Sequence, residues 1–125
     1  QVAMGADMNQ LIKAMHEAEA YHGPSIIIAY APCINHGIKM NNAQAEIKKA
    51  VAAGYWPMYR FNPEATPRLT IDSKAPTGSY QEFMKSENRY ASLMRQFPEA
   101  AEKLFVEAEK DAAERLENYK KLAAE

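Results

Sequence analysis

The sequence predicts an α/β fold, in which helices pack on a partial parallel sheet and a long helical extension follows at the C-terminal end. Two observations lead to this prediction. A short apolar segment at residues 1–5 and a continuous apolar run at residues 25–30 flank a helical pattern, which is the order of a βαβ unit. From residue 79 the pattern is helical to the end, so we expect a sheet region at residues 1–78 and a helical extension at residues 79–125.

The first predicted helix begins after Asp7, which has capping-box spacing to Gln10, and ends at the breaker sequence His22-Gly23-Pro24. Its apolar side chains repeat at helical spacing, at Met8, Leu11, Ile12 and Met15. The run that follows, Ser25–Tyr30, contains three isoleucines and does not alternate with polar residues. Such runs are typical of strands buried on both faces of a parallel sheet, so we expect that environment and a right-handed crossover.

A second helix is predicted between Asn41, which has capping-box spacing to Gln44, and Gly54, a suitable residue for the position after a helix end. Its inward-facing residues are Ile47, Ala50 and Val51. Two edge strands are expected next. Residues 55–61 are rich in aromatic side chains but contain a proline, which confines a strand to an edge or a bulge. Residues 68–72 alternate between apolar and polar side chains, like a half-exposed strand.

In the helical extension, Ser79 and Glu82 have capping-box spacing, and Pro98 marks a break and a second helix start. The first apolar stripe consists of Tyr80, Phe83, Met84, Tyr90 and Met94. The second stripe consists of Ala101, Leu104, Phe105, Ala108, Ala112, Leu116 and Tyr119. A helix that carries this second stripe would be about 40 Å long. Because it outruns the small sheet, we expect part of the stripe to lie against something outside the chain.

The composition is that of one globular domain, or of a piece of a larger one. Of 125 residues, 47% are hydrophobic and 25% are charged, and the net charge of −1 gives no basic field for nucleic acid. No apolar run approaches the roughly 20 residues of a membrane span, and we expect no membrane partner. A single cysteine suits a reducing, cytoplasmic compartment. Residues 1–5 suggest a boundary that cuts into a larger sheet, with processing of a short precursor as the alternative.

The segment Tyr30–Gly37 is the strongest candidate for chemistry, because polar residues there follow the carboxyl end of the predicted strand. Ligands and cofactors bind at that edge of open α/β sheets. The residues themselves leave several interpretations of Cys33 open: a small buried side chain, a nucleophile with His36 as its base, or a metal ligand whose partners lie outside the chain. Asn35 and His36 could equally form an ordinary turn with Gly37.

Other chemistry-bearing residue types have simpler interpretations. His16 and His22 are too far apart to share a helix face, so we expect exposed histidines rather than a metal pair. The aromatic cluster at residues 55–61 lacks the basic neighbours of a base-stacking surface, so packing is favoured. Alternating Glu and Lys at residues 99–125 are typical of a solvated helix face. The sequence has no glycine-rich phosphate loop, paired-cysteine metal motif or nucleophile elbow.

Two segments, residues 2–10 and residues 23–37, resemble the C-terminal end of pyruvate:ferredoxin (flavodoxin) oxidoreductases. The most specific part is Ile28-Ala29-Tyr30-Ala31-Pro32-Cys33-Ile34-Asn35-His36-Gly37. The similarity extends over nearly the whole chain, with further matching stretches at residues 53–56, 59–63, 69–74 and 80–84. The resemblance implies that residues 1–78 close the domain that binds thiamine diphosphate.

By the same resemblance, Cys33 is the last of four cysteine ligands to the 4Fe–4S cluster nearest the thiamine, and Asn35 and His36 lie near the cofactor site. The parent enzyme would convert pyruvate and coenzyme A to acetyl-CoA and pass electrons to ferredoxin or flavodoxin. We assign no catalytic residue to the chain. The other cluster ligands and the segment that holds Mg²⁺ and the diphosphate would lie in the rest of the parent, which we expect to be a homo-oligomer. The isolated chain should bind no cofactor and be inactive.

Two other functions remain open. The chain could be a non-enzymatic α/β interaction module whose long amphipathic helix docks on a partner. A stand-alone Cys/His hydrolase or thiol redox protein would need Cys33 and His36 in contact. Additional upstream sequence would separate these from the oxidoreductase, which requires three more cluster cysteines and a diphosphate motif.

Overall fold

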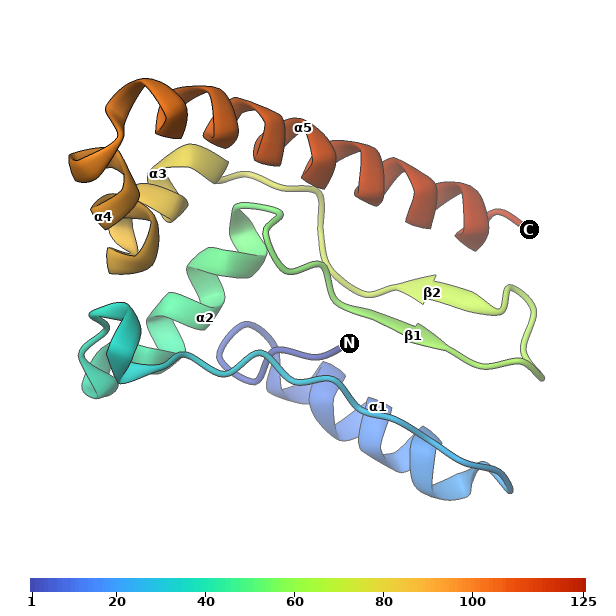
Figure 1. The fold of residues 1–125 in the computed structure, drawn as a ribbon. Helices are drawn as coiled ribbons and strands as arrows, with labels where there is room; N and C mark the ends of the chain where they lie inside the picture. The colour runs from blue at the N-terminus through green and yellow to red at the C-terminus, as the bar shows by residue number, and fades with distance from the viewer.

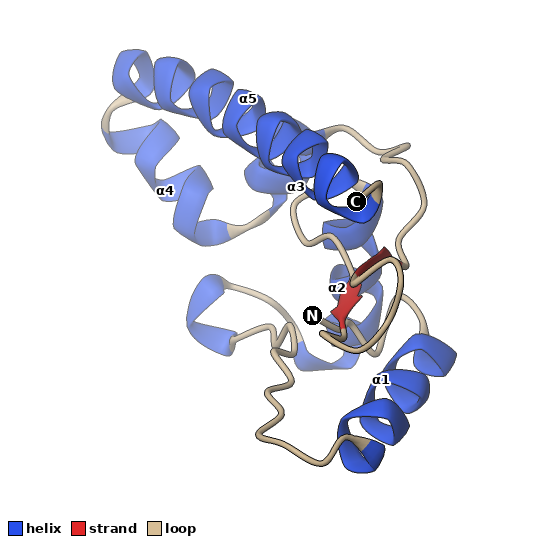
Figure 2. Cartoon of the chain, turned by 90° about the vertical axis from the view of Figure 1, so that its right-hand side faces the viewer, coloured by secondary structure: helices blue, strands red, loops and turns tan.

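The computed structural model describes the backbone of residues 1–125 and the side chains of all of them except His36. Its elements are α1 (Met8–Ala20), the 3-10 turns η1 (Ile34–His36) and η2 (Met40–Asn42), α2 (Ala43–Ala52), β1 (Tyr59–Phe61), β2 (Leu69–Ile71), α3 (Tyr80–Ser86), α4 (Asn88–Gln96) and α5 (Pro98–Ala123). The β1–β2 hairpin lies between α5 on one side and α1 on the other (Figures 1 and 2). Among the described residues, no helix is long and apolar enough to cross a membrane.

The sheet is smaller than the sequence predicts. Strands β1 and β2 pair in antiparallel orientation, with Arg60 opposite Thr70. Strand β1 occupies only the last three residues of the first predicted edge strand, and β2 occupies the centre of the second. The earlier part of residues 55–61 contains Pro57, which lacks the backbone N–H that a ladder needs. Leu69 is buried and Thr70 is exposed, so the predicted alternation in the second strand is confirmed.

The predicted parallel sheet is not confirmed, and a single parallel bridge stands in its place. Val2 pairs with Ala29, and its backbone N–H donates to the carbonyl of Ile28 at 2.9 Å, while its carbonyl accepts from Tyr30 N–H at 3.1 Å. Helix α1 connects the two bridged segments, so the order of a βαβ unit is present without regular parallel strands. One bridge is too short to form a ladder.

The prediction that Ser25–Tyr30 is buried on both faces is wrong for this chain. Ile26, Ile27 and Ile28 are 86%, 40% and 50% exposed. The physical reason is that this extended segment has only Val2 as a bridged neighbour, so no layer covers its faces. On α1 the apolar residues Met8, Ile12 and Met15 are exposed too. The uncovered apolar surface of the chain is therefore concentrated in its N-terminal third.

Three predicted helix starts are confirmed. The Asp7 carboxylate accepts a hydrogen bond from Gln10 N–H at 3.0 Å and caps α1, while the Ser79 hydroxyl accepts from Glu82 N–H at 3.3 Å and caps α3. Pro98 is the first residue of α5. In each case the residue type satisfies or removes a backbone N–H that has no partner inside the helix.

The predicted start of the second helix is wrong, whereas its end is confirmed. Asn41 lies inside the turn η2, and α2 begins two residues later without a side-chain cap from Asn42. A 3-10 turn takes the place of the side-chain cap, because its i to i+3 hydrogen bonds already pair backbone groups at the start of this helix. Gly54 follows the helix with φ of 74°, a left-handed conformation that favours glycine.

The main core lies between α2, α3 and α5, and includes Ala50, Tyr80, Phe83, Met84, Ala101, Phe105 and Ala112. This packing places most of the α5 stripe within the chain, and the expectation that part of the stripe lies against something outside the chain stays a prediction. Most of the stripe is buried or half-buried within the chain, and only Leu104 is mostly exposed. Near the end of α5, the ring of Tyr119 packs on Tyr59 of β1 at 5.0 Å. The boundary at residue 78 remains a prediction, although the core joins both predicted regions.

Candidate functional site

The candidate site is the loop of residues 31–37, called here the Cys33 loop. Cys33 is the residue before the turn η1, with an extended backbone, and its free thiol is half-buried. Asn35 is exposed within the turn. Gly37 closes the turn with φ of 78°, and its N–H donates to the carbonyl of Ile34 at 3.0 Å. The side chain of His36 is outside the described residues. Its predicted place near a cofactor therefore stays a prediction, and so does the contact with Cys33 that a hydrolase or thiol redox protein would need.

Both ends of the Cys33 loop contact the junction between α3 and α4. At the start, the hydroxyl of Tyr30 donates to the carboxylate of Glu87 at 3.2 Å. At the end, Gly37 lies against Asn88 so closely that a Cβ on the glycine would be 2.6 Å from the Cβ of Asn88. Residues more than fifty positions apart in the sequence therefore meet at this site.

Glu87 is the centre of a polar network beneath the loop. Its side chain is fully buried, at 0% exposed, and it accepts a hydrogen bond from Arg89 Nε at 2.7 Å. Arg89 also donates to the Tyr55 hydroxyl at 3.0 Å, and that hydroxyl is 2.7 Å from the hydroxyl of Tyr90. The Arg89 guanidinium lies over the Tyr90 ring, 4.8 Å from its centre, which adds a cation–π contact.

Burial, and after it the negative charge of Glu87, raises the pKa of Tyr30. Burial also raises the pKa of Tyr90, together with its hydrogen bond to Tyr55. Both phenols are therefore protonated at neutral pH, and the Tyr30 hydroxyl is a donor to Glu87. Sequence reasoning missed this network, because Glu87 and Arg89 fall within what reads as a continuous helix with solvated charges.

The described side chains offer little for a metal. They contain no group of three or more His, Cys, Asp and Glu residues that could hold an ion. His16 and His22 are exposed, as predicted. The aromatic residues Tyr55 and Trp56 pack against the core, which agrees with the packing interpretation. Among the described side chains of the Cys33 loop, the thiol of Cys33 is the one group of a type that binds iron–sulfur clusters, and one thiolate fits a single ligand position.

A second polar cluster ties α1 to the hairpin. The Arg60 guanidinium donates to both carboxylate oxygens of Glu17, at 2.6 and 2.7 Å, and to both of Asp72, at 2.8 and 2.9 Å. Burial alone would raise the pKa of Asp72, but hydrogen bonds from Arg60 and Gln10, together with the positive charges of Arg60 and Lys13, outweigh it and lower that pKa. The charged groups of Arg60, Glu17 and Asp72 are all paired, so this cluster stabilises the fold. Among the described side chains, the Gln10 oxygen Oε1 is buried without a hydrogen-bond partner.

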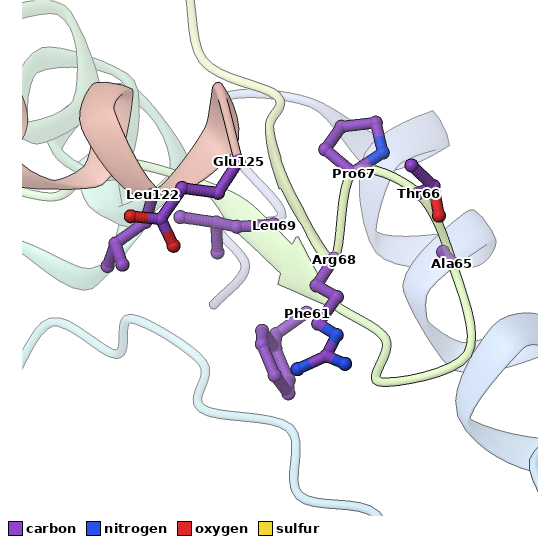
Figure 3. A pocket seen from close by; sticks show the side chains of 8 residues that line it. All are labelled: Phe61, Ala65, Thr66, Pro67, Arg68, Leu69, Leu122 and Glu125. Atoms are coloured by element: carbon purple, nitrogen blue, oxygen red, sulfur yellow. The ribbon is translucent and has the colours of Figure 1, made fainter.

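A pocket of about 530 Å³ lies between the hairpin loop and the end of α5. Figure 3 shows the side chains that line it. Its lining residues are Phe61, Ala65, Thr66, Pro67, Arg68, Leu69, Leu122 and Glu125. The hairpin loop and the Cys33 loop are at opposite ends of the molecule (Figure 1). The pocket therefore does not contribute to the candidate site.

Comparison with known proteins identifies the kind of protein to which this segment corresponds. No protein-family model matches the chain. The pyruvate:ferredoxin oxidoreductase of Moorella thermoacetica is 60% identical over 126 residues, which cover 98% of this chain and 11% of that protein. The chain matches a fragment of a pyruvate:ferredoxin (flavodoxin) oxidoreductase. The resemblance carried by residues 2–10 and 23–37 is thereby confirmed.

Two further oxidoreductases support the match. The pyruvate-flavodoxin oxidoreductases of Enterobacter agglomerans and Klebsiella pneumoniae are 52% and 47% identical over 99% and 100% of the chain. The chain again spans 11% of the length of each. These relatives include proteins named for ferredoxin and for flavodoxin.

Proposed function

We propose that the chain is part of a thiamine-dependent oxidoreductase that converts pyruvate and coenzyme A to acetyl-CoA and delivers electrons to ferredoxin or flavodoxin. The observation that carries this proposal is the end-to-end similarity, 47–60% identical, to oxidoreductases named for pyruvate. Thiamine diphosphate, Mg²⁺ and most ligands of the iron–sulfur cluster would be held by the rest of the parent. The chain by itself is expected to be inactive.

Within the parent, Cys33 contributes one thiolate to a 4Fe–4S cluster. Thiolate sulfur is the usual ligand of such clusters, and four cysteines are needed for each. A half-buried cysteine at the end of an extended segment suits this role, because its sulfur can reach a neighbouring domain without being fully solvated. When bound, a 4Fe–4S cluster would supply one-electron redox chemistry. Asn35 and His36 would lie beside the cofactor region and help to shape it.

The rest of the parent is also the partner that covers the exposed apolar surface. In an extended chain, the backbone N–H and C=O groups of successive residues point to opposite edges. Ile28 and Tyr30 bond to Val2, so the N–H and C=O groups of Ile27 and Ala29 point to the other edge. An exposed, isoleucine-rich edge associates with further strands. We therefore expect a strand from the rest of the parent to pair there and a further layer to cover α1.

The alternative of a non-enzymatic module that docks through its long helix loses its main support. That interpretation requires an uncovered apolar stripe on α5. Ala101, Phe105 and Ala112 of this stripe are instead buried in the core of the chain.

Substitution of Cys33 by alanine in the full-length parent tests the proposal. We expect the Cys33→Ala protein to bind thiamine diphosphate normally, to lose one 4Fe–4S cluster by iron analysis and electron paramagnetic resonance, and to reduce ferredoxin at least about tenfold more slowly. A matched control is Ile34→Ala, which truncates an exposed side chain in the same loop and should retain every cluster. Full ferredoxin reduction with all clusters present in the Cys33→Ala protein would refute the ligand assignment.

A further inference from the structure

We propose that the junction between α3 and α4, Glu87 and Asn88, positions Cys33 by holding its loop at both ends. The proposal rests on the cluster-ligand role of Cys33 and adds four positioning residues to it. Tyr30 on the N-terminal side of the loop contacts Glu87, and Gly37 on the C-terminal side contacts Asn88. Because Glu87 and Asn88 are consecutive, one rigid point of the fold anchors the whole loop.

The anchor itself cannot shift easily, because two helices fix it. Glu87 ends α3, with its N–H bonded to the Met84 carbonyl at 3.1 Å, and begins α4, with its carbonyl accepting from Tyr90 N–H at 3.0 Å. Its buried carboxylate is neutralised by Arg89 at 2.7 Å. A buried carboxylate without such a partner would be strongly destabilising, so the pair holds Glu87 in its place.

The contact at the start of the loop is equally constrained. The Tyr30 ring packs against Trp56, with ring centres 5.4 Å apart, and edge-on against Tyr55 at 6.3 Å. The backbone N–H of Tyr30 and the indole of Trp56 both donate to the carbonyl of Val2, at 3.1 and 3.0 Å. Tyr30 is thus held by its backbone, ring and hydroxyl. Cys33 follows three residues later, which an extended chain spans in about 10 Å.

At the other end, the fit between Gly37 and Asn88 excludes any side chain on the glycine. The glycine has φ of 78°, and an added Cβ would lie 2.6 Å from the Cβ and 3.3 Å from the Cγ of Asn88. Asn88 is held in turn by Arg95, whose Nη2 donates to its side-chain oxygen at 3.1 Å. A change at either residue would therefore move the C-terminal end of the turn that begins at Cys33.

Positioning matters because a single thiolate must meet a cluster whose other ligands belong to a different part of the protein. The groups that orient a metal ligand affect both the retention of the metal and its electronic properties. For iron–sulfur clusters, the reduction potential depends on hydrogen bonds and solvent exposure near the ligands. Loosening either end of the loop should therefore weaken cluster retention and change the potential, even though neither Tyr30 nor Gly37 is a ligand.

The test uses the full-length parent with three variants: Tyr30→Phe, Gly37→Ala and the double variant Gly37→Ala with Asn88→Gly. Tyr30→Phe keeps the ring and removes only the hydrogen bond to Glu87. The double variant removes the Asn88 Cβ that an alanine at position 37 would strike, so it should partly restore the loop. The measurements are the rate of cluster loss to an iron chelator and the reduction potential by electron paramagnetic resonance.

We expect Tyr30→Phe and Gly37→Ala to lose the cluster about tenfold faster than the wild-type protein. Their reduction equilibrium should change by up to about tenfold, which corresponds to about 59 mV for a one-electron couple. The double variant should recover part of both changes. The matched control is Asp72→Asn, which perturbs another largely buried arginine–carboxylate pair, between the two sides of the hairpin, and should leave the potential unchanged.

Each outcome is decisive. If Cys33→Ala loses the cluster while Tyr30→Phe and Gly37→Ala keep the wild-type rate and potential, the positioning role is wrong and the ligand role stands. If Cys33→Ala keeps every cluster, the proposed function itself fails. If Asp72→Asn shifts the potential as much as Tyr30→Phe does, the effect is general destabilisation and the proposal is overturned. If Gly37→Ala assembles no cluster, recovery in the double variant supports the contact with Asn88. The strain of an alanine at a φ of 78° persists in the double variant, so without recovery Tyr30→Phe decides: wild-type retention and potential there overturn the positioning role.

Discussion

The guanidinium of Arg60 joins α1 to the hairpin, and its replacement by methionine measures how strongly these parts depend on each other. The Arg60 side chain is 14% exposed, and its two carboxylate partners, Asp72 and Glu17, are 12% and 37% exposed. Breaking a buried ion pair by removing one partner costs about 3–5 kcal/mol. Solvent screens the Glu17 side of the cluster, so only the Asp72 side contributes at that level. We expect Arg60→Met to lower the free energy of unfolding by about 3 kcal/mol.

Urea titration of the chain, followed by the fluorescence of Trp56, is a suitable assay because Trp56 is the single tryptophan and packs against Tyr30. With a urea dependence of about 2 kcal/mol per molar, the unfolding midpoint should fall by about 1.5 M. Arg68→Met is the matched control, because Arg68 is exposed and its loss should change stability by less than about 0.5 kcal/mol. Equal midpoints for the two variants would refute the reasoning.

The same cluster makes stability depend on pH. Because hydrogen bonds and nearby positive charges outweigh burial and lower the pKa of Asp72, the unfolded chain binds this proton at higher pH than the folded chain does. The stabilisation is thus fully present above the unfolded pKa of about 3.9 and is lost as pH falls through the lower folded pKa. Urea midpoints of the wild-type chain should fall more steeply below about pH 4 than those of Asp72→Asn, whose side chain does not titrate.

Three further outcomes are expected. Gly54→Ala should destabilise the chain by at least about 1 kcal/mol in urea, because φ is 74° and the new Cβ would lie 2.8 Å from Pro76 Cγ. The isolated chain should self-associate at micromolar concentration in light scattering, and Ile27→Lys should prevent this, whereas Thr70→Lys on the hairpin should not. After iron–sulfur reconstitution the isolated chain should hold no 4Fe–4S cluster, since it supplies one of four ligands; cluster absorption from a monomer would contradict this.

The features that sequence reasoning predicted correctly are those set by near neighbours. Asp7, Ser79 and Pro98 mark helix starts because each acts on backbone groups within the next turn. The burial of residues 25–30 could not be predicted in the same way. It depends on which distant segments cover the run, and in this chain only Val2 bridges it, so the isoleucines are exposed.

In the candidate site too, local sequence features could be predicted and long-range contacts could not. Cys33 is a candidate because polar residues follow a strand-like run and because the surrounding sequence resembles a known family. Glu87 gives no such signal, since a glutamate within a helical pattern is ordinarily solvated. Its burial follows from contact with Tyr30, 57 residues away, and that pairing exists only in the folded chain. Long-range polar contacts of this kind are outside the reach of local pattern reasoning.

Residues 1 and 2 pair with two distant segments of the chain, and this pairing affects the expected order of folding. Val2 bridges Ala29, while Gln1 exchanges two backbone hydrogen bonds with Tyr59, 58 residues away. Closing such distant segments is entropically costly and slow, whereas helices form from local contacts. We expect α5 to become structured first and the strands last. Pulsed hydrogen exchange during refolding should therefore protect the amides of α5 before those of Tyr30 and Tyr59, and simultaneous protection would exclude this order.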